Sequence, residues 1–326
     1  MHWQSDVSVA DWISPRLSDD WSRDFTMHMA VPRGFDAYAR IFHPATRRTV
    51  PGGVVPSADD IARMPHDEAM RVLEQFVTAR VTWAETAETF GTTMHALAQW
   101  HAVTGATEPY GADGRVNGAE YQGGEEGFLE PELLTAVVQT AVEHTTTPRA
   151  GFAAVWEGWG DLVGSMRQIG QRAARFGDDG AMIGDIETTP HESFLARIRK
   201  SMMNNPFGKE TWHPGILSDD ISRGPRLSLP NRDYVLFAMS PGVFMYPTWQ
   251  ESVLWQHPDH TAFTHGPALL WPEDRAWVIV SEIDWDSTVV GGSEELISAL
   301  LNDDRLEAWR LPAESLLTAD ADEING

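Results

Sequence analysis

The sequence predicts an α+β fold in which helices pack on a mixed or mainly antiparallel sheet. Segments with strand-like alternation are interspersed with segments of helical periodicity, without the strict alternation that a parallel sheet requires. The chain has 326 residues, of which 42% are hydrophobic, so it can bury a sizeable core. Its clearest single unit is a C-terminal strand–turn–helix unit over residues 269–301.

The first third is expected to contain a strand, a loop and a helix. Residues 34–43 show partial strand alternation, and the Pro- and Gly-rich residues 44–56 are expected to form a loop. Ser57 and Asp60 make a variant of the capping box, which marks a helix N-terminus. Apolar residues follow at helical spacing, and we expect this face to be core. They are Ala69, Val72, Leu73, Phe76 and Val77.

A helix pair is expected over residues 82–101, where Thr82 and Glu85 form a capping box. The segment resembles the helix-turn-helix of bacterial transcription regulators. By that analogy, the residues that would face bases are Thr92, Thr93, His95 and Gln99. The second helix carries no Lys or Arg to hold phosphates, so a helix pair used for packing is the alternative.

A domain boundary is expected at residues 105–127, which are rich in Gly and acidic residues and lack periodicity. This linker or mobile loop would separate an N-terminal α+β region, 1–104, from a C-terminal α+β region, 128–318. The alternative is that both regions form one compact domain. Residues 319–326 are expected to be a frayed tail.

The elements of the C-terminal region follow from their periodicity. The expected helices are 130–144, 161–176 and 191–203. The expected strands are the first part of 151–162, then 233–239 and 276–284.

The composition limits which partners the protein can bind and in which cellular compartment we expect it. The formal net charge is −24, which argues against nucleic acid and favours a cation or a basic protein. Cysteine is absent, so disulfides, thiolate metal sites and cysteine nucleophiles are excluded. The N-terminus lacks the pattern of a signal peptide, and no apolar stretch approaches the length of a membrane span. We therefore expect a cytoplasmic protein with no membrane association. The sequence does not indicate an oligomeric state.

Tryptophan and carboxylates occur together at two places, which predicts a cleft for a small ligand. The chain has 14 Trp, and most are expected in the core. In the turn after the strand at 151, Trp156 and Trp159 flank Glu157, and aromatic walls beside a carboxylate suit a sugar or a cation. Trp271, Asp274 and Arg275 are the second group of ligand-binding candidates.

Three further carboxylates gather at the end of the strand expected over 277–286. Alternation would place Glu282, Asp284 and Asp286 on one face, close enough to bind Mg²⁺ or Ca²⁺ or to shift one another's pKa values. A metal- or carboxylate-dependent hydrolase is therefore an alternative function. A solvated strand end that leads into a helix capped by Ser293 is the other interpretation. We expect no cofactor, with a divalent metal at these carboxylates as the alternative.

Five segments together resemble an uncharacterised actinobacterial protein family with no assigned activity. They are GFDAYARIFHPA, TWAETAETFGTTMHALAQWHAVTG, FAAVWEGWGDL, LPNRDYVLF and LLWPEDRAWVIVSEIDWDSTVVGGS. The resemblance implies no catalytic residues. The function expected first is thus a binding or interaction protein with a cleft lined by Trp and carboxylates, and whether it is an enzyme stays open.

Overall fold

The structure is a computed structural model that describes residues 1–19, 24–106, 114–160, 162–165, 212–230, 232–258 and 264–326. The chain divides into two compact units, one formed by Met1–Trp156 with Pro225–Gly326 and the other by Glu157–Gly224. The helices expected over 161–176 and 191–203 fall almost entirely outside the described residues. In the second unit, the described elements are an isolated bridge between Ser165 and His213 and the short helix α7, Asp219–Ser222.

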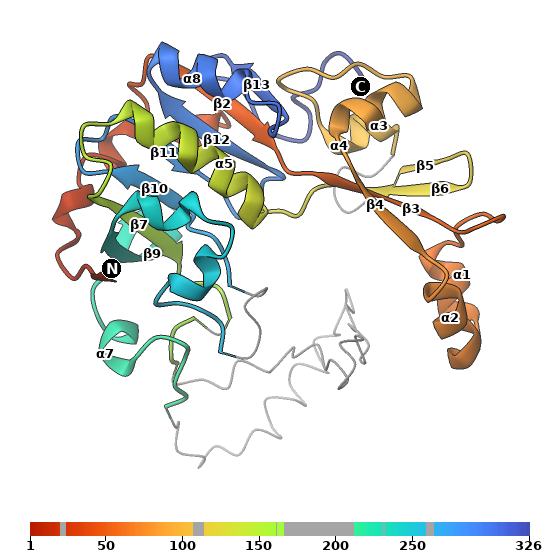
Figure 1. Cartoon of the computed structure of the whole chain (residues 1–326), viewed down its shortest axis with the longest axis horizontal. Helices are drawn as coiled ribbons and strands as arrows, with labels where there is room; N and C mark the ends of the chain where they lie inside the picture. Colours follow the sequence, from red (N-terminus) through yellow and green to blue (C-terminus); the bar gives the residue numbers. More distant parts are fainter. Residues whose placement is uncertain (20–23, 107–113, 161, 166–211, 231, 259–263) are drawn as a thin grey trace. The chain divides into compact units, whose positions relative to one another are not determined.

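A nine-stranded antiparallel sheet forms the centre of the first unit (Figure 1). The strand order is β1-β9-β7-β10-β11-β12-β2-β13, and β8 pairs with β9. Its strands are β1 His2–Trp3, β2 Ala37–Phe42, β7 Gly151–Trp156, β8 Leu227–Leu229, β9 Arg232–Met239, β10 Leu269–Pro272, β11 Val278–Val280, β12 Ser287–Gly292 and β13 Ala308–Leu311. The sheet and its helices confirm the α+β class.

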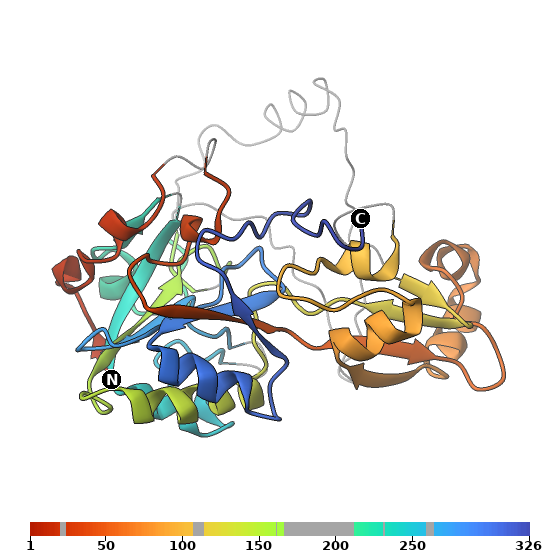
Figure 2. The ribbon, with the colours of Figure 1, turned by 90° about the horizontal axis from the view of Figure 1, so that it is seen from above.

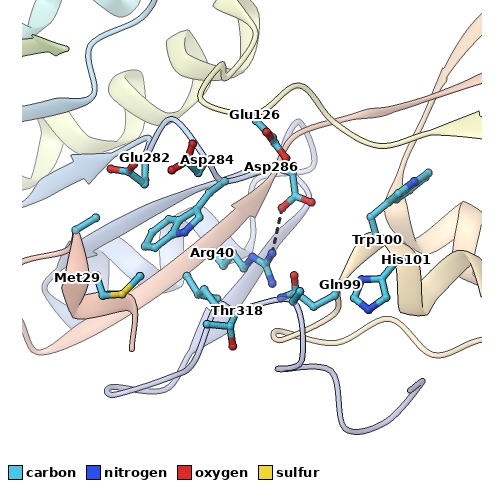
Figure 3. Close-up of a pocket in the computed structure, with 14 residues that line it drawn as sticks. Met29, Arg40, Gln99, Trp100, His101, Glu126, Glu282, Asp284, Asp286 and Thr318 are labelled. Atoms are coloured by element: carbon cyan, nitrogen blue, oxygen red, sulfur yellow. Dashed lines mark hydrogen bonds and ion pairs between the residues drawn. The ribbon is translucent and has the colours of Figure 1, made fainter. Parts of the chain in front are cut away.

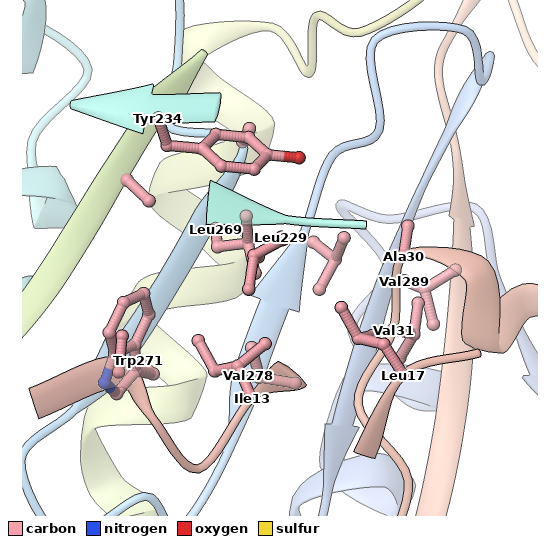
Figure 4. Packing of buried hydrophobic residues seen from close by; sticks show 14 of the residues in the cluster. Ile13, Leu17, Ala30, Val31, Leu229, Tyr234, Leu269, Trp271, Val278 and Val289 are labelled. Carbon is pink, nitrogen blue, oxygen red and sulfur yellow. The ribbon is translucent and has the colours of Figure 1, made fainter. Parts of the chain in front are cut away.

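Both faces of this sheet are covered. The helices α5, Pro131–Ala141, and α8, Glu294–Leu301, lie along one face (Figure 2). The other face packs against N-terminal 3-10 segments, and side chains such as Ile13 and Val31 meet Val278 and Val289 there (Figure 4). The 3-10 segments on and beside the sheet are Val7–Ala10, Ser14–Arg16, Met27–Met29, Val142–His144, Pro241–Met245 and Trp249–Ser252. Every residue of β2 and β12 is buried because both strands lie inside these layers.

A second, four-stranded sheet has the order β4-β3-β6-β5. Its strands are β3 Ala45–Thr49, β4 Val77–Val81, β5 Gly114–Val116 and β6 Ala119–Gln122. Its helices are α1 Ala58–Arg63, α2 His66–Leu73, α3 Trp83–Phe90 and α4 Trp100–Thr104. A separate apolar cluster that includes Phe42, Trp83, Trp100 and Tyr121 holds α3 and α4 to this sheet. Chain continuity from β2 into β3 links the two sheets.

The linker expected over 105–127 is structured where it is described. Residues 114–122 form the hairpin of β5 and β6, and Asn117 and Gly118 close it with φ values of 52° and 80°. Positive φ at both central residues is what a tight hairpin turn requires, and Asn-Gly supplies it at low cost. The hairpin completes the small sheet, so the two compact units are not divided at this point. The loop expected over 44–56 likewise contains β3.

The expectation that the helical face behind Ser57 is core is wrong. The capping box of Ser57 and Asp60 is present, but Pro65 separates two short helices, α1 and α2, and neither buries a residue. Leu73 is 41% and Val77 is 53% exposed. The periodicity of this segment is therefore real, while its apolar face is only half covered.

The helix pair expected over 82–101 forms only in part. The capping box of Thr82 and Glu85 starts α3, and Gly91 ends it in the left-handed conformation at φ 75°. Residues 92–99 are not helical, and α4 begins at Trp100. The second helix of a helix-turn-helix is thus absent from this described segment.

Two C-terminal expectations also need correction. The strand expected over 277–286 is limited to Val278–Val280, and residues 281–286 form the connection to β12. The tail is not frayed, since Ala321 and Asp322 are buried. By contrast, the helix expected over 130–144 is confirmed by α5, with Leu134, Val137 and Val138 buried.

Within the described ranges, no helix is long and apolar enough to cross a bilayer.

Candidate functional site

A cavity of about 200 Å³ opens beside the connection between β11 and β12 in the first unit (Figure 3). Polar side chains from five separate chain segments meet there with two Trp rings. The lining residues are Met29, Ala30, Arg40, Gln99, Trp100, His101, Glu126, Glu282, Asp284, Trp285, Asp286, Leu317, Thr318 and Ala319. The volume lies below the roughly 300–1,000 Å³ of sites for drug-sized ligands, so the occupant must be small.

Four carboxylates line one side of the cavity. Glu282, Asp284 and Asp286 come from the β11–β12 connection, and Figure 3 shows Glu126 beside them. The Gly127 amide donates to the Trp285 carbonyl at 2.8 Å, which fixes Glu126 against that connection. The alternation expected for these acids is thus replaced by a turn, yet the acids still converge.

Asp286 pairs with Arg40, whose side chain is only 2% exposed. Nη2 of Arg40 donates to Oδ1 of Asp286 at 3.3 Å, and Nε donates to the Ser287 hydroxyl at 2.8 Å. Nη1 donates to the carbonyls of Ala96 and Ala98 at 3.2 and 2.9 Å. Arg40 therefore ties the large sheet to the loop before α4 and sets one wall of the cavity.

Glu282 and Asp284 share a different cation. Arg232, at the start of β9, donates from Nη2 to Glu282 at 3.0 Å and to Asp284 at 2.5 Å. Its guanidinium also lies 5.6 Å from the ring centre of Trp156. Glu282 is buried, whereas the Asp284 side chain is 68% exposed. Arg232 thus offsets part of the negative charge from behind the cavity wall.

The carboxylates that face the cavity are held in conditions that disfavour their charge. Partial burial raises the pKa of Glu126, and the carboxylates of Asp286 and Asp284 raise it further. Burial also raises the pKa of Asp286, while Arg40 opposes the shift. Burial raises the pKa of Glu282 in the same way, against the effect of Arg232. A cation in the cavity would favour all three ionised forms, because an opposite charge at short range stabilises a carboxylate.

The opposite wall is made by the loop before α4 and by the C-terminal tail. Gln99 comes from the loop, and Leu317, Thr318 and Ala319 come from the tail. Asp322 joins these two segments. Its Oδ2 accepts from the backbone amide of Gln99 at 3.2 Å, and its Oδ1 lies 2.8 Å from Nε2 of His95. The expectation of a frayed tail overlooked this role. The tail carries three acidic residues, Asp320, Asp322 and Glu323, and no sequence pattern singles out Asp322 among them.

A buried polar chain lies behind the carboxylate side. Nδ1 of His43 lies 2.6 Å from the carbonyl of Glu125, which can only accept, so this nitrogen carries the proton. Nε2 then accepts from the Thr288 hydroxyl at 2.9 Å, and Ser281 lies 2.7 Å from Thr288. Burial lowers the pKa of His43 to about 4. His43 is thus a neutral connector between the strands and the segment that carries Glu126.

The ligand-binding candidates from the sequence do not meet in one place. Trp156 lies near Glu282 and Asp284 through Arg232. Trp271 is fully buried and pairs with Phe152 in the sheet, at the other end of β7 from Trp156. From Phe152, the partner of Trp271, to Trp156 the strand spans about 13 Å, which places the two Trp residues four positions apart along β7.

The remaining candidates have other surroundings. Asp274 accepts from the hydroxyls of Thr145 and Thr146 at 2.7 Å, and these bonds help to lower its pKa to about 2 against the effect of burial. Arg275 lies 5.6 Å from the ring centre of Trp12. Glu157 and Trp159 belong to the second unit, while every residue that lines the cavity belongs to the first.

The four residues expected to read DNA bases make contacts within the chain. The Thr92 hydroxyl donates to the Val103 carbonyl at 2.9 Å, and the Thr93 amide donates to Asn325 at 2.8 Å. His95 pairs with Asp322, and Gln99 is buried. This side of the chain therefore serves to hold the tail.

The metal candidates Glu282, Asp284 and Asp286 are shared between two arginines, as described above. Among the described residues, no group of three or more His, Asp or Glu side chains is arranged to hold a metal ion.

Comparisons with protein-family models, with curated proteins and with solved structures find no match to this chain.

Proposed function

We propose that this protein binds a small organic cation in the cavity of the first unit. The single observation that carries the proposal is the lining itself, in which four carboxylates face a small space beside two Trp rings. Carboxylates are acceptors for ammonium and guanidinium groups, and the faces of Trp rings attract cations. The overall charge of −24 steers a cation towards the protein from solution.

Charge balance favours an organic cation over an anion or a neutral sugar. Glu126, Glu282, Asp284 and Asp286 outnumber the two arginines, Arg40 and Arg232, that contact them. Binding would also offset the repulsion among carboxylates that raises the pKa of Glu126. A metal ion is the weaker alternative because Glu282, Asp284 and Asp286 are already engaged in ion pairs with two different arginines.

A thermal-shift screen tests the ligand class. The panel contains cadaverine, agmatine and choline as organic cations, Mg²⁺ and Ca²⁺ as metal ions, and glutarate as an anion. We expect stabilisation by the organic cations alone, because a ligand that binds only the native state raises its stability. Stabilisation by glutarate, or by the metal ions alone, would contradict the proposal.

A matched pair of variants locates the site. Glu125 and Glu126 are adjacent and both exposed, but only Glu126 lines the cavity. We expect Glu126→Gln to weaken cadaverine binding about tenfold, since it removes one charge-assisted hydrogen bond. We expect Glu125→Gln, which makes the same change in net charge, to leave the affinity nearly unchanged. Equal effects of the two variants would mean that general charge, and not the cavity, attracts the cation.

A further inference from the structure

The cavity is electrically two-sided. Figure 3 shows the carboxylates of Glu126, Glu282 and Asp284 along one side and Gln99 along the other. The Arg40 guanidinium lies between them, paired with Asp286. The two sides come from different segments, since Gln99 is fixed by Asp322 of the tail, whereas Glu126 is fixed by Trp285 of the β11–β12 connection. A ligand that fills the cavity therefore meets acceptors at one end and donors at the other.

Arg40 has an N–H group left to donate a hydrogen bond at the end of the cavity that Gln99 lines. Its Nη2 carries two hydrogens, and among the described residues it makes one hydrogen bond, at 3.3 Å to Asp286. The side chain is 98% buried, as its exposed fraction is 2%. An unfilled N–H in such a place is costly unless a ligand or water accepts from it.

Gln99 adds a second donor beside Arg40. Its Nε2 also carries two hydrogens and makes one long bond of 3.4 Å, to the Leu97 carbonyl. The residue is 8% exposed and faces the cavity. A carboxylate is the small group best able to accept from a guanidinium and a primary amide together.

We infer that the ligand is a small zwitterion, an α-amino acid with a basic side chain, whose carboxylate is held by Arg40 and Gln99. This inference rests on the proposed cation site. The ammonium groups lie against Glu126 and Asp284, and the α-carboxylate lies against Nη2 of Arg40 and Nε2 of Gln99. A basic amino acid fits better than a neutral one, because the lining acids outnumber the arginines. The volume of about 200 Å³ suits a single amino acid and excludes a longer peptide.

Decarboxylated pairs test the inference on the unaltered protein. Lysine and cadaverine differ only by the carboxylate, as do arginine and agmatine. By calorimetric titration we expect lysine to bind about tenfold more tightly than cadaverine, since the carboxylate gains charge-assisted hydrogen bonds. Cadaverine binding that equals or exceeds lysine binding would overturn the inference and leave the proposed cation site standing. Binding of neither compound would overturn both.

A substitution of equal size tests the donor end. Gln99→Glu replaces a donor amide by a carboxylate, so we expect lysine to lose its advantage while cadaverine binds at least as well as before. Gln75→Glu makes the same change in net charge at an exposed position in the segment after α2, outside the cavity lining. It should preserve the lysine preference. If Gln99→Glu also preserves that preference, Gln99 does not hold the carboxylate and the inference fails. The decarboxylated pairs give the answer even if this variant does not fold.

Discussion

At the scale of single residues, burial separates the titratable groups that a ligand can reach from those that it cannot. Glu126 is exposed at the cavity, so a ligand can reach its carboxylate, whose pKa is raised. His43 is 1% exposed, and its two nitrogens are both engaged, so its lowered pKa affects stability instead. Burial therefore shifts the pKa values of both groups, but only the Glu126 carboxylate faces the cavity.

The first prediction concerns His43 and pH. Its pKa falls from 6.5 to about 4 on folding because burial disfavours the imidazolium. Between these two values the unfolded chain binds a proton that the folded chain does not, so stability falls as the pH falls through this window. We expect His43 to contribute about 1.4 kcal/mol per pH unit there, or about 3 kcal/mol in all.

Urea denaturation from pH 7 to pH 4 measures this dependence. His43→Gln should flatten the slope relative to the parent chain, although the half-buried His265, whose pKa also falls to about 4, keeps part of it. His66→Gln, at an exposed position on α2, should leave the slope unchanged. An equal slope in all three proteins would contradict the role given to His43.

At the scale of elements, α1 and α2 differ from the other described α-helices of the first unit, α3, α4, α5 and α8, each of which buries residues. Neither buries a residue, whereas α5 buries seven of its eleven. They connect β3 to β4, and Thr49 pairs with Val77 at the base of this connection. The connection can therefore be shortened without breaking the strand pairing.

The second prediction follows from this difference. Replacing residues 58–74 with a short Gly/Ser linker should change the free energy of unfolding by less than about 1 kcal/mol, since exposed residues contribute little. Leu134→Ala, in α5, should cost about 2–5 kcal/mol because Leu134 is 3% exposed. If the linker replacement costs as much as Leu134→Ala in the same urea titration, the description of α1 and α2 is wrong.

Local signals allowed several elements to be predicted, and non-local pairing explains the failures. The capping boxes at Ser57 and Thr82 depend on residues three apart, and both are present. The strand β3 was missed because its Pro- and Gly-rich flanks indicate a loop, and only its pairing with β4 and β6 makes it a strand. The hairpin of β5 and β6 was missed although its Asn-Gly pair is a strong turn signal.

The candidate site could be predicted only in part, for the same reason. Glu282, Asp284 and Asp286 are close in sequence, and their grouping could be read directly. Arg40 lies more than 200 residues away, and Glu126 and Gln99 come from two further segments. Their convergence depends on how β2 pairs with β12 and on how the tail is anchored by Asp322. Neither is encoded in a local pattern.

At the scale of the whole molecule, net charge acts on stability and on binding in opposite directions. A charge of −24 repels itself in the compact state and attracts cations from solution. Salt screens both effects, because the screening length falls from about 20 Å to about 4 Å between low and high ionic strength.

The third prediction is therefore a pair of opposite salt effects. Raising NaCl from about 20 mM to about 500 mM should raise the melting temperature of the free protein and weaken cadaverine binding severalfold. Thermal melts and titrations at both salt concentrations measure the two effects. A melting temperature that falls with salt would show that net charge does not destabilise the folded protein. An affinity that does not change with salt would show that net charge does not attract cadaverine.

The most direct test of the cation site is a calorimetric titration of cadaverine into the intact protein at neutral pH, beside a titration of glutarate. The two compounds have five carbons each and carry opposite charges, so the comparison reports which sign of charge the cavity accepts. We expect saturable binding of cadaverine at one site, weakened by Glu126→Gln, and no binding of glutarate. Saturable binding of glutarate, or no heat from cadaverine beyond dilution, would contradict the assignment of this cavity to a small organic cation.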